Sequence, residues 1–384
     1  MKRLSFVLAI ALLGLASAQE PIRIGVNLEL SGRFATIGNT TLQGIETAQA
    51  QMGTVLDRPI ELSVCDNATT VEGSVSCANR FVDEGVLGVL GPIATTHAIP
   101  AAEVLQNAGI IMVSTASTNP ATTQIGEYIF RMAYTDDFQG VVAARYAYDD
   151  LEARRAAIFR QQDDDYSFGL AGFFNDEFQT LGGETAVVDF VSGTVDFSAQ
   201  IADIRGFDPE VIYFSGFCPE GAPLVTQLRQ QGFEQQVLAA DASDDSQCPE
   251  GGGTAFDGVI YTGFGGPEVL SGEAQARAEE FGRFFEEANP AATDFNGFTL
   301  AGADSYNVLL EAIDVAGSAE IADVLAALSS LTAYPGVSGE ITYEGTDGTP
   351  ADRTIAFFRY NVRSSNDWDS ESLFGLGTGA EDTQ

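Results

Sequence analysis

Hydroxyl-bearing residues follow two strand-like segments in the first half of this sequence. The apolar run 86–90 leads into a loop that ends at Thr95. The run 110–113 leads into a second loop, which carries Ser117 and Thr118. Short hydroxyls beside free backbone N–H groups at a helix N-terminus hold a carboxylate without a cation. The alternative is that these residues only cap helices, as Ser and Thr commonly do.

Aromatic and acidic residues follow strand-like segments in the second half. They are Tyr166, Phe217 and Asp241. In open parallel sheets, ligands collect at the carboxyl ends of the strands, so we expect these side chains to face the same space as the hydroxyl loops. An aromatic pair covers an apolar group, and a carboxylate neutralises an ammonium. The alternatives are core packing for Phe217, exposure for Tyr166 and a helix cap for Asp241.

Few residues suit catalysis. His97 is the only histidine, Lys2 is the only lysine, and no pair of acids stands out among the many present. His97 is either a ligand contact or a structural hydrogen-bonding group, and we favour the second, because a lone histidine forms no metal or catalytic set. The sequence therefore predicts no enzyme activity, no metal and no cofactor.

The charge of the chain is strongly negative. Its 55 Asp and Glu residues against 18 Lys and Arg residues give a formal net charge of −37. Nucleic acid binding needs clustered cations, which release counterions from the phosphates. We therefore exclude nucleic acid as a partner and interpret the acidity as a solvated surface suited to a salty medium.

The first 18 residues read as a secretion signal. Lys2 and Arg3 precede the apolar run 4–15, and cleavage is expected after Ala18. The run is too short to span a bilayer, and no second run of spanning length follows it. The first cysteine, Cys65, lies too far along to carry a lipid anchor. We expect release into the periplasm without an anchor.

Four cysteines in an exported chain indicate disulfide bonds. Three pairings are formally possible for Cys65, Cys77, Cys218 and Cys248. The first two lie close in sequence and the last two lie in another region, so we predict the local pairs. The alternative is free buried thiols.

Apolar strand-like segments alternate with helix-like segments along most of the chain. The predicted strands are 22–28, 62–64, 86–90, 110–113, 156–159, 186–190, 211–214 and 237–239. One predicted helix carries an apolar stripe made of Leu42, Ile45, Ala48 and Met52. The alternation predicts an α/β fold of two lobes, each a doubly wound parallel sheet, joined by a three-segment hinge.

The length of 384 residues exceeds what a single core usually covers, and three interruptions of the pattern mark crossings between lobes. We expect an N-terminal lobe of residues 19–137 and 264–341, a C-terminal lobe of residues 138–263 and 342–364, and a loose acidic tail of residues 365–384.

Short motifs along nearly the whole mature chain resemble a known family. They are Ile24-Gly25-Val26, Leu30-Ser31-Gly32, Gly91-Pro92 to Pro100, Ser114 to Pro120, Arg131 with Asp136 and Gln139-Gly140, Tyr166 with Gly169, and Gly216 to Glu220. With this set and its spacing, the chain resembles the substrate-binding proteins of branched-chain amino acid ABC transporters. The resemblance implies the type I periplasmic binding protein fold.

The resemblance also implies roles for the loop residues. Positions that match Thr95 and Thr118 hold the ligand carboxylate in that family, and Ser117 lies in the same loop. The ammonium partners match the carbonyl of Ala116, the hydroxyl of Thr118 and the acid Asp241.

The aromatic positions of the family match Tyr166 and Phe217. Phe217 stands where a tyrosine is usual, and Ile37 stands where an aromatic residue is common. Asp241 replaces a longer glutamate. These departures keep a clamp for a zwitterion but leave the side-chain preference open.

We therefore expect an exported binding protein that captures an amino acid, first of all a branched-chain or other aliphatic one, and delivers it to the membrane permease of an ABC importer. A monomer is expected. The alternatives are an amide, a urea-like solute or an aromatic acid as ligand, and a membrane receptor instead of a permease as partner.

Overall fold

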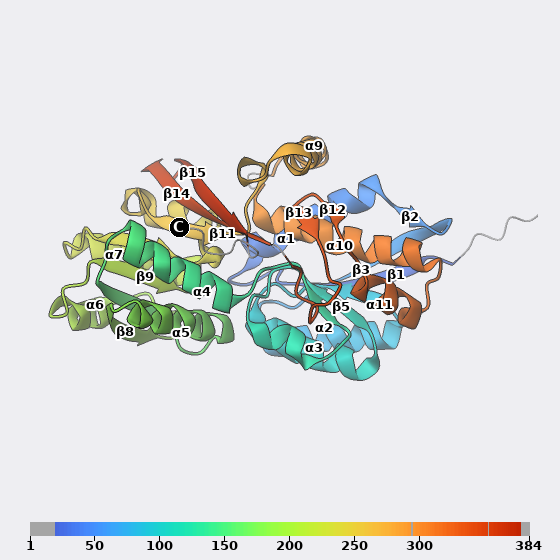
Figure 1. Cartoon of the computed structure of the whole chain (residues 1–384), viewed down its shortest axis with the longest axis horizontal. Helices are drawn as coiled ribbons and strands as arrows, with labels where there is room; N and C mark the ends of the chain where they lie inside the picture. Colours follow the sequence, from blue (N-terminus) through green and yellow to red (C-terminus); the bar gives the residue numbers. More distant parts are fainter. Residues whose placement is uncertain (1–19, 293–294, 352, 378–384) are drawn as a thin grey trace, which may run out of the picture.

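The computed structural model describes residues 20–292, 295–351 and 353–377. Within these ranges the chain forms two α/β lobes arranged along the long axis of the molecule (Figure 1). The predicted signal, residues 1–18, lies outside the described residues.

The N-terminal lobe is built on a six-stranded sheet of order β2-β3-β1-β4-β5-β6. The strands are β1 (Ile22–Leu28), β2 (Thr54–Val55), β3 (Arg58–Asp66), β4 (Gly88–Leu90), β5 (Ile111–Ser114) and β6 (Ile129–Arg131). The helices are α1 (Ala35–Gln51), α2 (Val71–Glu84), α3 (Thr95–Ala108), α9 (Gly272–Ala288), α10 (Gly297–Ala316) and α11 (Ile321–Ser329). Helices α2 and α3 cover one face of the sheet, and α1, α10 and α11 cover the other (Figure 1).

The C-terminal lobe is built on a seven-stranded sheet of order β15-β14-β11-β10-β9-β7-β8. The strands are β7 (Arg155–Gln161), β8 (Glu184–Phe190), β9 (Val211–Ser215), β10 (Gln236–Ala239), β11 (Ile260–Gly263), β14 (Thr354–Ser364) and β15 (Asp367–Gly377). The helices are α4 (Asp136–Arg145), α5 (Asp165–Thr180), α6 (Ser198–Arg205), α7 (Cys218–Gln230) and α8 (Gln247–Gly252). A short hairpin, β12 (Tyr334–Gly336) with β13 (Gly339–Ile341), packs on α9 and α10.

Strand β7 shows how an apolar run positions helices on both faces of a sheet. Ala156 and Ile158 belong to a buried cluster that includes residues of α4 and α5. Ala157 and Phe159, which alternate with them, belong to a cluster that includes residues of α6 and α7. Because successive side chains of a strand point to opposite faces, a continuous apolar run is buried on both sides.

Helices α1 and α10 pack closely because glycines lie at their contact. A Cβ atom at Gly44 would collide with the carbonyl oxygen of Thr299, and one at Gly302 would collide with the carbonyl oxygen of Thr41. This close approach fixes the start of α10 beside α1. Both helix starts contribute to the cavity described below.

The α/β fold and the two lobes are confirmed, but the sheets are mixed and not wholly parallel. Strand β2 runs antiparallel to β3, β14 runs antiparallel to β11, and β15 runs antiparallel to β14. Each predicted strand overlaps an observed strand. Helix α1 covers the predicted apolar stripe, although Met52 falls just past its end and is 44% exposed.

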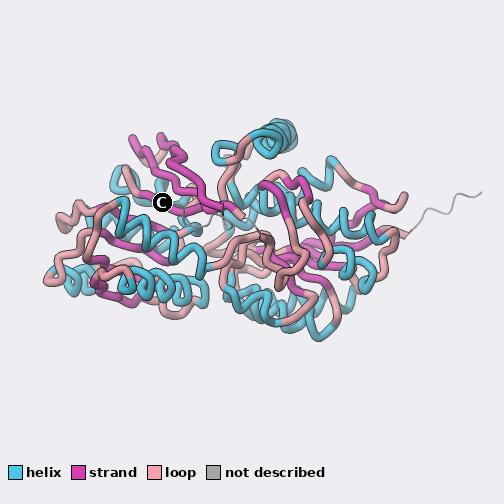
Figure 2. The backbone as a smooth tube through the Cα atoms, in the orientation of Figure 1, coloured by secondary structure: helices cyan, strands magenta, loops and turns pink. Residues whose placement is uncertain are grey.

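The expected loose tail is wrong for most of its length. Residues Asp367–Gly377 form β15, which pairs along β14 at the edge of the C-terminal sheet (Figure 2). The remainder of the expected tail, residues 378–384, lies outside the described residues. Hydrogen bonding to a partner strand overrides the polar, acidic composition of this segment.

The chain passes between the two sheets three times: from β6 to α4, from β11 to α9 and from β13 to β14. The last connection runs along the N-terminal lobe first. Tyr343 donates a hydrogen bond to the carbonyl of Arg131 (2.7 Å), and Arg131 N–H donates to the carbonyl of Gly348 (3.0 Å). This segment therefore joins the second lobe later than the boundary expected after residue 341.

Both predicted disulfide bonds are confirmed. Cys65 pairs with Cys77, and Cys218 pairs with Cys248. Each bond closes a local segment within one lobe. In the part of the chain that the structure describes, no helix combines the length and apolar character needed to cross a membrane.

Candidate ligand-binding site

A cavity lies between the lobes, at the carboxyl ends of strands from both sheets. The space that protein atoms leave empty there is about 260 Å³, a volume that includes open solvent. The N-terminal lobe contributes Ile37, Ile93, Ala94, Thr95, Ala116, Thr118 and Phe298, and the C-terminal lobe contributes Tyr166, Phe217, Asp241 and Ala242. Residues far apart in sequence thus meet because parallel strands end at one edge of each sheet.

One end of the cavity is formed by the loops after β4 and β5. Thr95 is the first residue of α3, so its hydroxyl lies beside the unpaired N–H groups at the N-terminus of that helix. Its Oγ1 lies 3.0 Å from Oγ of Ser117, which lies 2.7 Å from Oγ1 of Thr122. The backbone N–H of Asn119 approaches Thr95 Oγ1 at 3.5 Å. This end offers hydroxyl and N–H donors suited to a carboxylate.

Ser117 supports Thr95 through a contact between their hydroxyl groups. Its side chain is buried and does not line the cavity. The ligand contact expected of Ser117 stays a prediction, and in this structure its hydroxyl is taken up between Thr95 and Thr122. The neighbouring Ala116 and Thr118 do line the cavity.

Asp241 is the one acidic residue in the cavity lining. It follows β10 at the start of a short 3-10 helix, Asp241–Ser243. Its Oδ1 accepts hydrogen bonds from the hydroxyl of Tyr166 (2.6 Å) and from Nε2 of Gln139 (2.7 Å). Burial raises the pKa of Asp241 to about 6, while these two hydrogen bonds oppose the rise. The two hydrogen bonds hold the carboxylate in place, and a buried carboxylate is stabilised further by a cationic partner.

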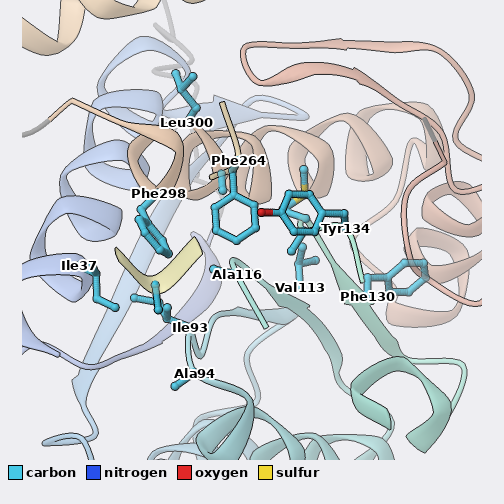
Figure 3. Close-up of a cluster of buried hydrophobic side chains, with 14 of the residues drawn as sticks. Ile37, Ile93, Ala94, Val113, Ala116, Phe130, Tyr134, Phe264, Phe298 and Leu300 are labelled. Atoms are coloured by element: carbon cyan, nitrogen blue, oxygen red, sulfur yellow. The ribbon is translucent and has the colours of Figure 1, made fainter. Parts of the chain in front are cut away.

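Much of the cavity lining is apolar. In Figure 3 the side chains of Ile37, Ile93 and Phe298 gather beside Ala116. Phe217 lies across from them on the C-terminal lobe, with its ring 5.5 Å from that of Tyr166. Burying apolar surface against such a wall favours a ligand with a hydrocarbon side chain.

The two lobes touch around the cavity, so the structure is a closed form. Oγ1 of Thr96 donates to Oδ2 of Asp164 and accepts from the N–H of Asp165, both at 2.9 Å. Nδ2 of Asn119 donates to the carbonyl of Asp165 at 3.1 Å. These bonds join the N-terminal loops to the start of α5 in the other lobe.

A second set of contacts closes the other side of the cavity. Arg33 forms an ion pair with Glu220 (2.7 Å), and its guanidinium lies 4.6 Å from the centre of the Phe34 ring. Phe34 packs on Phe217 with ring centres 4.1 Å apart. Glu220 is buried, which raises its pKa, and the charge of Arg33 opposes that rise. The contacts of Arg33 with Glu220 and of Phe34 with Phe217 span the two lobes.

His97 makes the structural hydrogen bond that the sequence analysis favours. Its Nδ1 lies 2.7 Å from Oε1 of Glu29, and the Glu29 carboxylate also accepts from the N–H groups of Ile93 and Ala94. His97 does not line the cavity. It holds the loop that presents Thr95.

The remaining predicted residues meet around one cavity: Ile37, Thr95, Ala116, Thr118, Tyr166, Phe217 and Asp241. Sequence reasoning missed the roles of Arg33, Phe34, Gln139 and Phe298. The sequence analysis names Gln139 only as part of a family motif, and no sequence pattern indicated that it contacts Asp241. Within the described ranges, no group of three or more His, Cys, Asp or Glu side chains is placed to hold a metal ion.

Two α/β lobes that close over a small, partly apolar cavity define a solute-binding protein of the two-lobe type. A family model for periplasmic binding proteins matches residues 21–367. The chain therefore belongs to the periplasmic binding protein family.

Relatives and solved structures agree with this assignment. An amino acid binding protein of Pseudomonas aeruginosa is 33% identical over 326 residues, 81% of this chain and 84% of the relative. The Leu/Ile/Val-binding protein BraC3 of Rhizobium johnstonii is 30% identical over 369 residues, 94% of this chain and 98% of the relative.

Among solved structures, the leucine-binding protein LivK of Thermotoga maritima matches with a TM-score of 0.85 and 32% identity, covering 91% of this chain and 97% of that one. A solute-binding protein of Rhodopseudomonas palustris HaA2, in complex with p-hydroxybenzoic acid, matches with a TM-score of 0.80 and 20% identity over 93% and 97% of the two chains. The second match bears on the fold alone.

Proposed function

We propose that this protein binds a free α-amino acid with an aliphatic side chain between its lobes and delivers it, chemically unchanged, to the permease of an ABC importer. The observation that carries the proposal is the presence of two unlike polar groups in the lining of one partly apolar cavity. Thr95 offers donors at a helix N-terminus, and Asp241 offers a buried carboxylate. A zwitterion has one charge for each group.

The apolar wall supports an aliphatic side chain. Ile37, Ile93 and Phe298 line the cavity, and no arginine or lysine lines it in the described part of the chain. A leucine-binding structure and a Leu/Ile/Val-binding relative lie among the similar proteins, which supports the same ligand class. The family and the predicted signal support a periplasmic location.

An aromatic acid is the second candidate. Tyr166, Phe217 and Phe298 give the cavity three aromatic faces, and one structure of the same fold binds p-hydroxybenzoic acid. Such a ligand has no amine, so it would leave Asp241 buried without a cationic partner. The aliphatic amino acid is favoured on this ground.

Native mass spectrometry of protein purified without denaturation tests the proposal. We expect a complex whose added mass equals that of leucine, isoleucine or valine, with the same mass recovered after prolonged incubation. A bound aromatic acid favours the second candidate. A bound solute that is converted to product contradicts a transport function.

A further inference from the structure

A buried acid lies next to the loop that presents Thr95. Glu29 directly follows β1 and is fully buried. Its Oε2 accepts a hydrogen bond from the N–H of Ile93 (3.2 Å), and its Oε1 accepts one from the N–H of Ala94 (3.3 Å). Ile93, Ala94 and Thr95 all line the cavity, whereas Glu29 does not. Glu29 therefore acts on the cavity wall through these two N–H groups.

His97 holds the same carboxylate from another side. Its Nδ1 lies 2.7 Å from Oε1 of Glu29, and its backbone carbonyl accepts a hydrogen bond from Oγ of Ser74 on α2 (3.0 Å). Nδ2 of Asn27, a residue of β1, donates to Oγ of Ser74 (3.2 Å). All four side chains are buried. His97 is thus fixed from β1 and from α2, and its ring orients the carboxylate of Glu29.

The backbone around this acid is also closely packed. A Cβ atom at Gly38 would collide with the carbonyl oxygen of Glu29, so α1 passes directly against this residue. Ile37, the neighbour of Gly38, lines the cavity. At the start of the loop, Oγ of Ser114 donates a hydrogen bond to the carbonyl of Pro92 (2.7 Å). The loop before α3 is therefore held through both its carbonyl and its N–H groups.

These contacts divide the N–H groups around the start of α3 into two sets. Glu29 accepts from the two N–H groups that precede the helix. The next two, of Thr95 and Thr96, belong to the first turn, where N–H groups have no acceptor within the helix. The direction of the second set depends on how the first set is held. Donors that are fixed before a ligand arrives increase its affinity, because binding then orders fewer groups.

We propose that Glu29 is a positioning residue for the carboxylate of the ligand, because it fixes the loop 91–95 so that Thr95 and the free N–H groups of α3 meet that carboxylate. This role rests on the proposed function, since it needs a ligand with a carboxylate. Glu29 does not touch the ligand, and His97 assists by holding the Glu29 side chain. Without Glu29, the buried N–H groups of Ile93 and Ala94 lose their acceptor, and the loop must shift to satisfy them.

Calorimetry with L-leucine and with L-leucinol, which lacks the carboxylate, tests this role. We expect Glu29→Ala to weaken leucine binding at least about tenfold and to leave leucinol binding unchanged, because only the carboxylate contact is disturbed. Asp304→Ala is the matched control. Asp304 is a fully buried acid of the same lobe that accepts from the N–H groups of Val337 and Ser338, and its loss should keep the wild-type ratio of the two affinities. Equal weakening of both ligands by Glu29→Ala overturns the inference.

Two substitutions of His97 separate positioning from packing. An asparagine amide donates from nearly the position of Nδ1, whereas a leucine side chain fills the space without a donor. We expect His97→Asn to bind leucine as the wild type does, and His97→Leu to bind it at least about fivefold more weakly. Equal leucine affinities in these two variants contradict the inference.

Hydrogen exchange in the ligand-free protein separates this role from the proposed function. The N–H groups of Ile93 and Ala94 should exchange faster in Glu29→Ala than in the wild type, because they lose their acceptor. Asp304→Ala should leave their exchange unchanged. Unchanged exchange in Glu29→Ala overturns the inference and leaves the proposed function standing. If exchange is faster but no amino acid binds the wild type, the proposed function fails and the positioning of the loop by Glu29 is upheld.

Discussion

At the scale of single residues, we propose that Asp241 selects the ligand that the cavity accepts. Burial disfavours its charge, whereas Tyr166 and Gln139 hold Oδ1 and favour it. Both side-chain hydrogen bonds end on the same oxygen, the backbone N–H groups of Asp241 and Ala242 also favour the charged form, and Asp241 lines the cavity. We predicted from the sequence that Asp241 and Tyr166 face the same space as the hydroxyl loops, because each follows a parallel strand, and both line the cavity.

Replacing Asp241 should remove the charge partner of the ligand's ammonium group. We expect Asp241→Asn to weaken leucine binding by about 2 to 5 kcal/mol, the usual cost of removing one member of a buried charge pair. Asp203→Asn, which changes an exposed acid on α6, is the matched control and should bind as the wild type. Calorimetry gives both affinities. Equal leucine affinity in the Asp241→Asn variant would mean that the amine lies elsewhere.

At the scale of helices and strands, apolar runs in the sequence predicted strands correctly, whereas strands with a polar sequence were missed. The predicted strands overlap observed ones because continuous apolar runs in buried parallel strands leave a clear pattern. Strand β15 was missed because its sequence is acidic and polar, and its pairing with β14 depends on a partner strand. Strand β11 is not among the predicted strands, and glycines follow it directly. The roles of Gln139 and Phe34 were missed because their partners lie about a hundred or more residues away.

The contact between α1 and α10 depends on small residues, and a single methyl group should disturb it. We expect Gly44→Ala to lower the free energy of unfolding by about 1 to 3 kcal/mol, because the new Cβ meets the backbone of Thr299 and not a flexible side chain. Gly172→Ala on α5 is the control, since a Cβ there meets no other atom within 4 Å. Urea denaturation of both variants measures the difference. Equal free energies of unfolding for the two variants would show that α1 and α10 can move apart without loss of stability.

At the scale of the whole molecule, closure joins the lobes through few contacts. Arg33 with Glu220 and Phe34 with Phe217 bridge one side, and Thr96 with Asp164 bridges the other. An open form lacks these contacts, so a ligand that touches both lobes shifts the molecule toward the closed form. The fold class and the two lobes followed from strand and helix alternation. The residues whose contacts join the lobes could not be predicted from the sequence, because they become neighbours only when the lobes meet.

Weakening one interlobe contact should therefore reduce affinity without unfolding either lobe. We expect Arg33→Ala to raise the Kd for leucine by about tenfold, since the buried Glu220 loses its partner in the closed form. Arg160→Ala breaks a comparable ion pair, with Asp189, inside the C-terminal lobe and should leave the Kd unchanged. Small-angle scattering with and without leucine should show less compaction for Arg33→Ala. An equal loss of affinity in both variants would argue against a closure role for Arg33.

The comparison of L-leucine with 4-methylpentanoate tests the central claim most directly, because the two share the carboxylate and the side chain and differ only in the amine. If the cavity holds a zwitterion between Thr95 and Asp241, calorimetry should show leucine binding at least about a hundredfold more tightly. Equal or tighter binding of 4-methylpentanoate would contradict the account, since it would leave Asp241 without its proposed partner.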